Sequence, residues 1–254
     1  MDRLIYTAMT GASQVLDEQA TIANNLANTS TSGFRAQMFA YRAVPLKTQD
    51  QLATNNNDVS RTFVLASTPV PDFTPGIISR TGNPTDVAIQ GDGWFSVQTA
   101  DGNEAYTRNG TFHVDENGQL VDSANRVVVG NGGPIAVPPG AQVTIGTDGT
   151  VSELGGGDSP NQIAVIDKLK LVNPGNATML RGNDGLFRTA DGQPAQDDPT
   201  VQVVQGAVES SNVNPVEAMV SMIANARQFE MHMKMLSTVD SNEQSANALL
   251  NFSS

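Results

Sequence analysis

The 254-residue chain contains no cysteine, a single tryptophan and two histidines. The absence of cysteine excludes disulfide bonds and thiolate metal sites, and it leaves the redox compartment of the protein open. Basic side chains are also few, because 14 Lys and Arg stand against 26 Asp and Glu and give a formal net charge of −12. Phosphate backbones and anionic membranes are unfavourable partners for such a chain, so we expect no nucleic-acid binding.

Long hydrophobic runs are missing as well. No apolar stretch approaches the ~18 residues of a membrane-spanning helix, so we expect no membrane insertion. Thr7, Thr10 and Ser13 interrupt the apolar region that a secretory signal would need. Hydrophobic residues nevertheless make up 39% of the chain, which suffices for a packed core. The sequence leaves open a cytosolic protein or one exported by a machine that reads an uncleaved terminus.

Side chains that carry chemistry are scarce. His113 falls in a strand-like segment and His232 in a helical one, so a histidine-based site would have to join distant parts of the chain. Gly91-Asp92-Gly93 lacks the third glycine and the following helix of a dinucleotide-binding motif. Residues 115–118 resemble a calcium loop but have the wrong spacing for an EF-hand. We therefore expect no enzyme activity, no cofactor and no metal.

The two ends of the chain carry the clearest pattern, a heptad spacing of apolar residues. The N-terminal stripe, which only Gln19 interrupts, consists of Ile5, Ala8, Ala12, Val15, Ile22 and Leu26. The C-terminal stripe consists of Met219, Met222, Ala226, Phe229, Met233 and Leu236. Alternating three- and four-residue steps are typical of a coiled-coil seam, which must be buried against another helix. We expect the two helices to pair with each other, with copies of themselves, or with both.

Both helices have marked boundaries. Short polar residues and a glycine at positions 28–33 favour a turn, so the first helix should end just before them. Gly33 should complete this turn, and Phe34 is an isolated apolar residue that we expect to insert into a neighbouring subunit. At the other end, Asn214 suits an N-cap and Pro215 the first helical position.

The chain between the helices is rich in turn signals. Eight Asp-Gly or Asn-Gly pairs begin at residues 92, 101, 109, 117, 131, 148, 184 and 191. Such pairs supply the positive φ that tight hairpins require, and the intervening segments have the β-branched and aromatic content of strands. We predict an α+β protein with a mainly-β central domain and terminal helices that pair as a coiled coil on assembly. Its parts are an N-terminal helix of a helical core (1–33), a connector (34–74), the β domain (75–206) and the C-terminal helix of the core (207–254).

Three groups of residues carry a resemblance to a known family. They are Asn24-Asn25-Leu26-Ala27-Asn28 with Gly33-Phe34-Arg35, then Gly91-Asp92-Gly93-Trp94-Phe95 with Tyr106-Thr107-Arg108-Asn109-Gly110 and Asp115-Glu116-Asn117-Gly118, and finally Glu209-Ser210-Ser211-Asn212-Val213 with Arg227-Gln228-Phe229-Glu230. With these segments the chain resembles the flagellar axial proteins of bacteria, the family of rod and hook proteins. Phe229 stands where the family usually has tyrosine. The opening residues 1–6 and the short length are similar to the proximal rod members.

The resemblance implies a structural subunit of the flagellar basal-body rod. It implies export by the flagellar type III apparatus without a cleaved signal, followed by assembly in the periplasm with copies of itself and with other proximal and distal rod subunits. The terminal helices would form the inner layer around the export channel, and the β domain would face outward. The expected assembly interface then comprises both apolar stripes together with Asn25, Asn28, Gly33, Phe34, Asn212 and Val213.

Other functions remain open at this point. The nearest is a different axial subunit, such as the distal rod protein. A secreted adhesin or sugar-binding module would explain a polar β domain but not the paired heptads. A hydrolase would need a pocket that joins His113 to acidic residues from separate turns.

Overall fold

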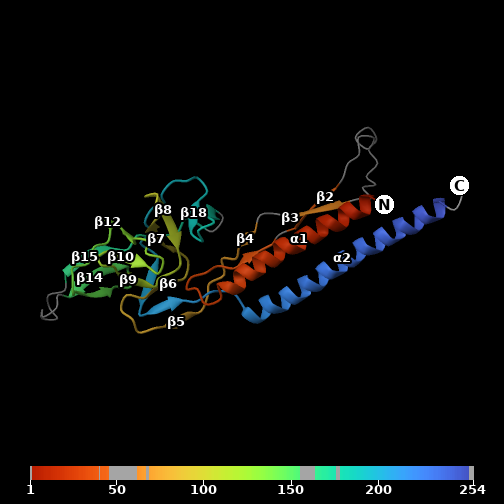
Figure 1. The fold of residues 1–254 in the computed structure, drawn as a ribbon. Helices are drawn as coiled ribbons and strands as arrows, with labels where there is room; N and C mark the ends of the chain where they lie inside the picture. The colour runs from red at the N-terminus through yellow and green to blue at the C-terminus, as the bar shows by residue number, and fades with distance from the viewer. Residues whose placement is uncertain are drawn as a thin grey trace. The chain divides into compact units, whose positions relative to one another are not determined.

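The computed structural model describes residues 2–39, 41–45, 62–66, 69–154, 164–175 and 178–251 (Figure 1). The chain divides into two compact units. We call them the helical unit, which comprises residues 1–27, 37–72 and 214–254, and the β unit, which comprises residues 28–36 and 73–213. The segment expected as a connector, residues 34–74, is thus shared between the two units.

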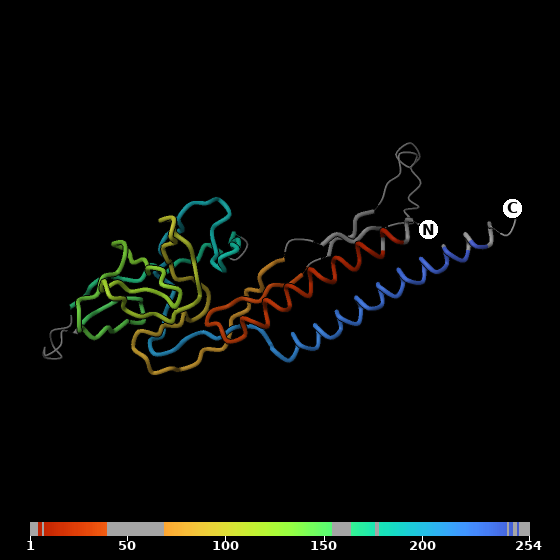
Figure 2. The backbone as a smooth tube through the Cα atoms, in the orientation of Figure 1, coloured from red at the N-terminus to blue at the C-terminus, as the bar shows by residue number. Residues whose placement is uncertain are grey.

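The helical unit is built on two antiparallel helices that lie side by side (Figures 1 and 2). They are α1 (Asp2–Ala27) and α2 (Pro215–Asn251). Two antiparallel strand pairs accompany them, β1 (Gln37–Met38) with β4 (Val70–Pro71) and β2 (Tyr41–Pro45) with β3 (Thr62–Ala66). Strands β1 and β3 contact α1. The two predicted terminal helices are therefore confirmed.

The start of α2 follows from local hydrogen bonding. The Asn214 side-chain oxygen accepts the backbone N–H groups of Val216 at 3.1 Å and Glu217 at 3.4 Å. These N–H groups have no partner within the helix, so Asn214 is the N-cap that the sequence predicts. Pro215 occupies the first helical position, where its missing N–H costs nothing.

The β unit holds the remaining strands, all paired antiparallel. They are β5 (Ile78–Arg80), β6 (Val87–Gln90), β7 (Trp94–Gln98), β8 (Glu104–Thr107), β9 (Phe112–Val114), β10 (Leu120–Asp122), β11 (Val129–Gly130), β12 (Gly133–Pro134), β13 (Gln142–Ile145), β14 (Thr150–Leu154), β15 (Ala164–Lys168), β16 (Leu171–Val172), β17 (Met179–Arg181), β18 (Phe187–Thr189), β19 (Gln202–Gln205) and β20 (Ala207–Glu209). The largest sheet has the order β16-β7-β8-β18-β17, and a second has the order β13-β14-β15. This confirms the α+β class with a mainly-β centre.

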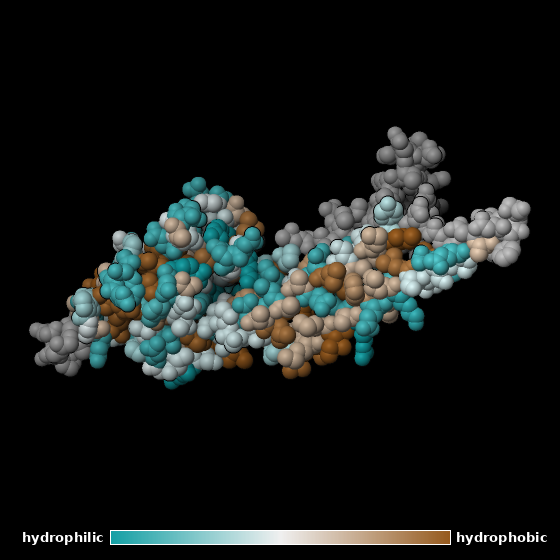
Figure 3. All heavy atoms as spheres, viewed as in Figure 1, coloured by the Kyte–Doolittle hydropathy of each residue, from teal (hydrophilic) through white to brown (hydrophobic). Residues whose placement is uncertain are grey.

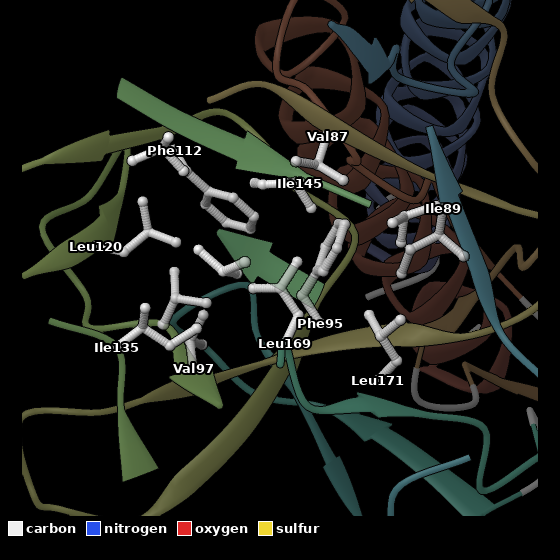
Figure 4. Close-up of a cluster of buried hydrophobic side chains, with 14 of the residues drawn as sticks. Val87, Ile89, Phe95, Val97, Phe112, Leu120, Ile135, Ile145, Leu169 and Leu171 are labelled. Carbon is white, nitrogen blue, oxygen red and sulfur yellow. The ribbon is translucent and has the colours of Figure 1, made fainter. Parts of the chain in front are cut away.

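The core of the β unit gathers side chains from most of these strands (Figure 4). Phe95 of β7 and Phe112 of β9 meet edge to face with ring centroids 5.1 Å apart. Burial of each large apolar side chain stabilises by roughly 1.5–3 kcal/mol, so this cluster is the main source of stability in the unit. A smaller cluster contains Trp94, the only tryptophan, whose ring lies 4.5 Å from that of Phe187.

Six of the eight predicted turn glycines adopt positive φ. Gly110 is one of the two exceptions, and its role is steric instead. A Cβ atom at this position would overlap the carbonyl oxygen of Val87 in the neighbouring strand. The glycine is therefore required by the close approach of two backbones rather than by its own conformation.

Candidate assembly interface

The predicted stripe of α1 forms the inner side of the helical unit. Ala8, Ala12 and Val15 are buried, and the remaining apolar members of the stripe are half-buried. Small residues dominate the middle of this stripe, so another helix can approach α1 closely there.

The predicted stripe of α2 is partly buried and partly exposed in the single chain. Met222, Phe229 and Leu236 are half-buried, whereas Met219, Ala226 and Met233 are exposed. The side of α2 that turns inward consists of Ala218, Met222, Asn225, Phe229, His232, Leu236 and Val239. This seam keeps the heptad spacing but is shifted by one residue at alternate positions. Ala218, Asn225 and His232 stand in it where the predicted stripe has Met219, Ala226 and Met233.

A glycine of α1 explains why a histidine faces inward. A Cβ atom at Gly11 would lie only 2.7 Å from Cε1 of His232, so the imidazole occupies the space that a side chain at position 11 would fill. Hydrophobic periodicity cannot reveal this arrangement, because it depends on a hole in the partner helix. The seam is also imperfect: His232 Nδ1 and Asn225 Nδ2 are buried without a hydrogen-bond partner among the described residues.

The Gly11–His232 contact predicts an effect whose sign depends on the partner residue. Gly11→Ala should destabilise the helical unit by roughly 1–3 kcal/mol, because the new methyl group overlaps the imidazole. In a His232→Ala background the same change should stabilise by about 1 kcal/mol, since only the higher helix propensity of alanine remains. Thermal melting of the helical circular dichroism signal measures both effects. Equal effects of Gly11→Ala in the two backgrounds would contradict the contact.

Large apolar side chains remain exposed on both helices (Figure 3). On α2 they include Val216, Met219, Val220, Ile223 and Met233, and on α1 they include Tyr6, Met9 and Leu16. Several large apolar side chains exposed on neighbouring turns of one helix, as on α2, indicate an interaction surface.

A buried charged cluster forms the second notable feature, and it lies within the β unit. Glu209, at the end of β20, accepts a hydrogen bond from Arg35 at 2.6 Å through one carboxylate oxygen and from Arg108 at 2.7 Å through the other. All three side chains are at least 97% buried. The backbone N–H of Gly76 also donates to Glu209, at 2.8 Å. One carboxylate thus joins four segments of the chain.

The cluster contains two cations and one anion. Burial lowers the pKa of the Arg108 guanidinium, and the neighbouring Glu209 carboxylate opposes this effect. Arg108 also donates to the backbone carbonyls of Gly93 at 2.6 Å and Gly91 at 2.8 Å. Removal of the carboxylate would leave two buried guanidinium groups without the ion-pair partner that they share.

The turn that follows α1 is held in the β unit by the same region. Gly33 has φ +68°, donates its N–H to the Glu209 carbonyl at 2.7 Å, and has no room for a Cβ against the backbone of Arg108. Phe34 is buried, and the Arg181 guanidinium lies 4.5 Å from its ring centroid. The expectation that Phe34 inserts into a neighbouring subunit is therefore corrected, because its own chain already covers the ring.

Other predicted interface residues also bond within the chain. Asn25 makes two hydrogen bonds with the backbone of Gln37, at 2.8 and 2.9 Å. The Asn212 side chain accepts the N–H of Ala36 at 2.7 Å and donates to the carbonyl of Thr74 at 3.0 Å. Asn28 accepts the Thr31 hydroxyl at 3.1 Å, and the Val213 N–H donates to the Ser211 hydroxyl at 3.2 Å. These residues shape the chain around the helix ends.

Arg35, Arg108 and Glu209 lie in three separate motifs of the sequence, and the sequence alone predicted no role for them. The sequence did contain a signal for these residues, because each motif carries a charged residue among turn and apolar residues. A pairing of residues so distant in the chain becomes visible only in the fold.

The described residues contain no cluster of three or more His, Asp or Glu side chains able to hold a metal ion. A pocket between Pro174, Thr189 and Gln193 includes one carboxylate, that of Asp191, and no histidine. Across the same residues, neither helix is long and apolar enough to cross a membrane.

Comparison with protein families places these features in a class. The description "Flagella basal body rod protein" matches residues 5–35, "Flagellar hook protein FlgE/F/G D1 domain" matches 88–153, and "Flagellar basal body rod FlgEFG protein C-terminal" matches 204–249. The matches cover both helices and much of the β unit. The chain is thus of the class of rod and hook proteins of the bacterial flagellum.

Individual relatives narrow the class. The chain is 51% identical to the flagellar basal-body rod protein FlgF of Salmonella typhimurium strain LT2 and 52% identical to that of Escherichia coli strain K12, each over 100% of both chains. Identity to the flagellar basal-body rod protein FlgG of Buchnera aphidicola subsp. Schizaphis graminum is 34%, over 93% of this chain and 95% of the relative. The chain belongs to the family of flagellar basal-body rod proteins FlgF.

This membership gives the function in outline. The protein is a structural subunit of the rod in the flagellar basal body, it assembles with other rod components, and it is not an enzyme. The hydrolase and adhesin alternatives are thereby set aside.

Proposed function

We propose that the protein joins the proximal part of the rod through its helical unit. The observation that carries this proposal is the exposed apolar surface of α2, on which Met219 is 53% and Met233 is 47% exposed. Burial of each such side chain would stabilise the assembled state by roughly 1.5–3 kcal/mol. A rod subunit needs such a surface on every copy.

The predicted interface residues take three roles in this proposal. The exposed residues Met219, Ala226 and Met233 contact neighbouring subunits directly. The half-buried Met222, Phe229 and Leu236 contribute to the seam with α1 and to the edge of the contact surface. The residues that shape the helix pair and its connections are Ile5, Ala8, Ala12, Val15, Ile22, Asn25, Leu26, Asn28, Gly33, Phe34, Asn212 and Val213.

We also propose that the flagellar type III apparatus exports the chain and that it assembles in the periplasm. The lack of cysteine supports this order of events, since folding after export needs no disulfide. The seam supports it as well, because its buried unpaired Asn225 and His232 atoms make the isolated helix pair less stable. Docking against neighbours would then strengthen helices that are weakly held alone.

Charges on the exposed α2 surface test the proposal. Met219→Asp and Met233→Asp should abolish incorporation into rods and motility, because a carboxylate would be buried at the subunit contact. In solution, the free energy of unfolding of both variants should lie within about 0.5 kcal/mol of that of the unaltered chain, since these side chains are exposed. Gln228→Asp, on an exposed part of α2 outside this surface, is the matched control, and cells that carry it should be motile. Normal motility of the methionine variants would refute the proposed role of α2.

A further inference from the structure

Arg181, at the end of β17, stands apart from the other arginines of the β unit. The arginines that form an ion pair with a carboxylate are Arg35, Arg108, Arg126 and Arg188. Arg80 is exposed, so water solvates its charge. Arg181 is half-buried, yet no carboxylate of the described residues forms an ion pair with it. Because a charge withdrawn from water needs a partner of opposite charge, this site is incomplete in the single chain.

Two contacts within the β unit hold the Arg181 guanidinium in place. Its central carbon lies 4.5 Å from the ring centroid of the buried Phe34, and its Nη1 donates to the backbone carbonyl of Arg35 at 3.0 Å. A guanidinium has five N–H donors, so most of them remain available after this bond. No Arg181 nitrogen is among the buried side-chain atoms that lack a partner, so the available donors reach the surface.

The surroundings of Arg181 are already positive. Arg35 and Arg108 share the single carboxylate of Glu209, so that cluster has one cation in excess. Burial lowers the pKa of the Arg181 guanidinium, as it does at Arg108, but only at Arg108 does a carboxylate of the described residues oppose the effect. A further carboxylate beside Arg181 would therefore be attracted by the whole group.

Copies of this chain supply carboxylates in excess. With 26 acidic and 14 basic side chains, two copies repel each other unless their contact neutralises some of the charge. On the β unit, Asp101, Glu116 and Asp191 are exposed and form no ion pair among the described residues. Every copy thus carries both a guanidinium without an acidic partner and surplus carboxylates, so one kind of contact can repeat from copy to copy.

We propose that Arg181 is a docking point of the β unit, where a carboxylate of a second copy binds in the rod. The inference rests on the proposed function and adds a contact that lies outside the helices. A guanidinium suits this role because two of its parallel N–H groups can donate to both oxygens of one carboxylate. Its half-buried position beside Phe34 reduces the screening by water that weakens exposed ion pairs.

Neutralisation of Arg181 tests the docking point. Arg181→Met should lower the amount of protein in isolated basal bodies roughly tenfold, because the partner carboxylate loses its cation. The midpoint of urea unfolding, followed by Trp94 fluorescence, should stay that of the unaltered chain, since the lost hydrogen bond is offset by removal of a half-buried charge. Arg181→Lys should give an intermediate amount, because it keeps the charge but not the paired donors. Arg80→Met, the same neutralisation at an exposed arginine, is the matched control and should assemble normally.

A zero-length cross-link identifies the group that binds Arg181. A water-soluble carbodiimide joins an amine to a carboxylate in direct contact with it: an amide bond forms, and the carbodiimide takes up the water that is lost and becomes a urea. In basal bodies that contain Arg181→Lys, this reagent should join position 181 of one copy to an Asp or Glu of a second copy, and peptide mapping locates both ends. Lys170 and Glu104, 2.7 Å apart within one chain, are the internal control for coupling. Arg181→Met should give no product at position 181.

The outcomes separate this inference from the proposed function. Normal amounts of Arg181→Met in basal bodies would overturn the docking point but leave assembly through α2 standing, since Met219→Asp and Met233→Asp test α2 independently. A urea midpoint lowered in Arg181→Met would overturn it as well, because the residue would then act in folding. Coupling of position 181 within one chain or to a different protein would overturn the second copy as the partner. So would absence of that product in a sample where Lys170 and Glu104 are coupled.

Discussion

Replacement of Glu209 by alanine is expected to destabilise the β unit by about 3–5 kcal/mol, more than any other ion-pair change in the described residues. The carboxylate is 99% buried and is shared by two guanidinium groups. Its removal leaves both cations in a site from which water is excluded, and loss of one partner of a buried pair is costly for this reason. Glu209→Gln should cost less, since the amide oxygen still accepts one of the hydrogen bonds.

The single tryptophan makes this measurement specific. Trp94 lies in the β unit against Phe187, so its fluorescence in a urea titration follows that unit and not the helices. Asp184→Ala is the matched control, because Asp184 forms an ion pair of similar length, 2.6 Å, with Arg188 while both side chains are about 40% exposed. An exposed pair contributes at most ~1 kcal/mol. Equal costs for the two substitutions would show that the Glu209 cluster does not hold the unit together.

The cluster also explains why the β unit does not coincide with the predicted domain of residues 75–206. Arg35 and Glu209 both lie outside those limits, yet each is buried in the β unit. Turn signals and strand composition located the strands themselves, as at Trp94–Gln98. They could not locate the unit boundary, because it depends on a contact between residues 174 positions apart.

In the helices, too, features set by neighbouring residues could be predicted from the sequence, whereas features set by contacts between distant residues could not. The N-cap at Asn214 and the end of α1 at Ala27 depend on neighbouring residues, and both were predictable. The inward side of α2 was predicted only in part, since three of its seven members, Met222, Phe229 and Leu236, also belong to the predicted stripe. The choice of His232 over Met233 depends on the gap at Gly11, which hydrophobic spacing along α2 does not record.

The second large effect is expected at Gly33, where even the smallest side chain should disrupt the β unit. The residue has φ +68°, which costs a non-glycine residue roughly 1–2 kcal/mol. A Cβ atom would in addition overlap the Arg108 backbone, so the turn would have to move away. That movement would break the 2.7 Å hydrogen bond to the Glu209 carbonyl and pull at Arg35 in the charged cluster. We expect a total loss of about 3 kcal/mol or more for Gly33→Ala.

Gly82 supplies a control that separates conformational strain from overlap. It has φ +76°, close to the value at Gly33, but a Cβ there would meet nothing within 4 Å. Gly82→Ala should therefore lose only the 1–2 kcal/mol of the left-handed conformation. The comparison uses urea unfolding followed by Trp94 fluorescence, so both glycines are tested in the same unit. This expectation replaces the one in which Gly33 acts at a subunit contact: a Gly33→Ala chain as stable as Gly82→Ala, yet absent from rods, would restore the intersubunit role.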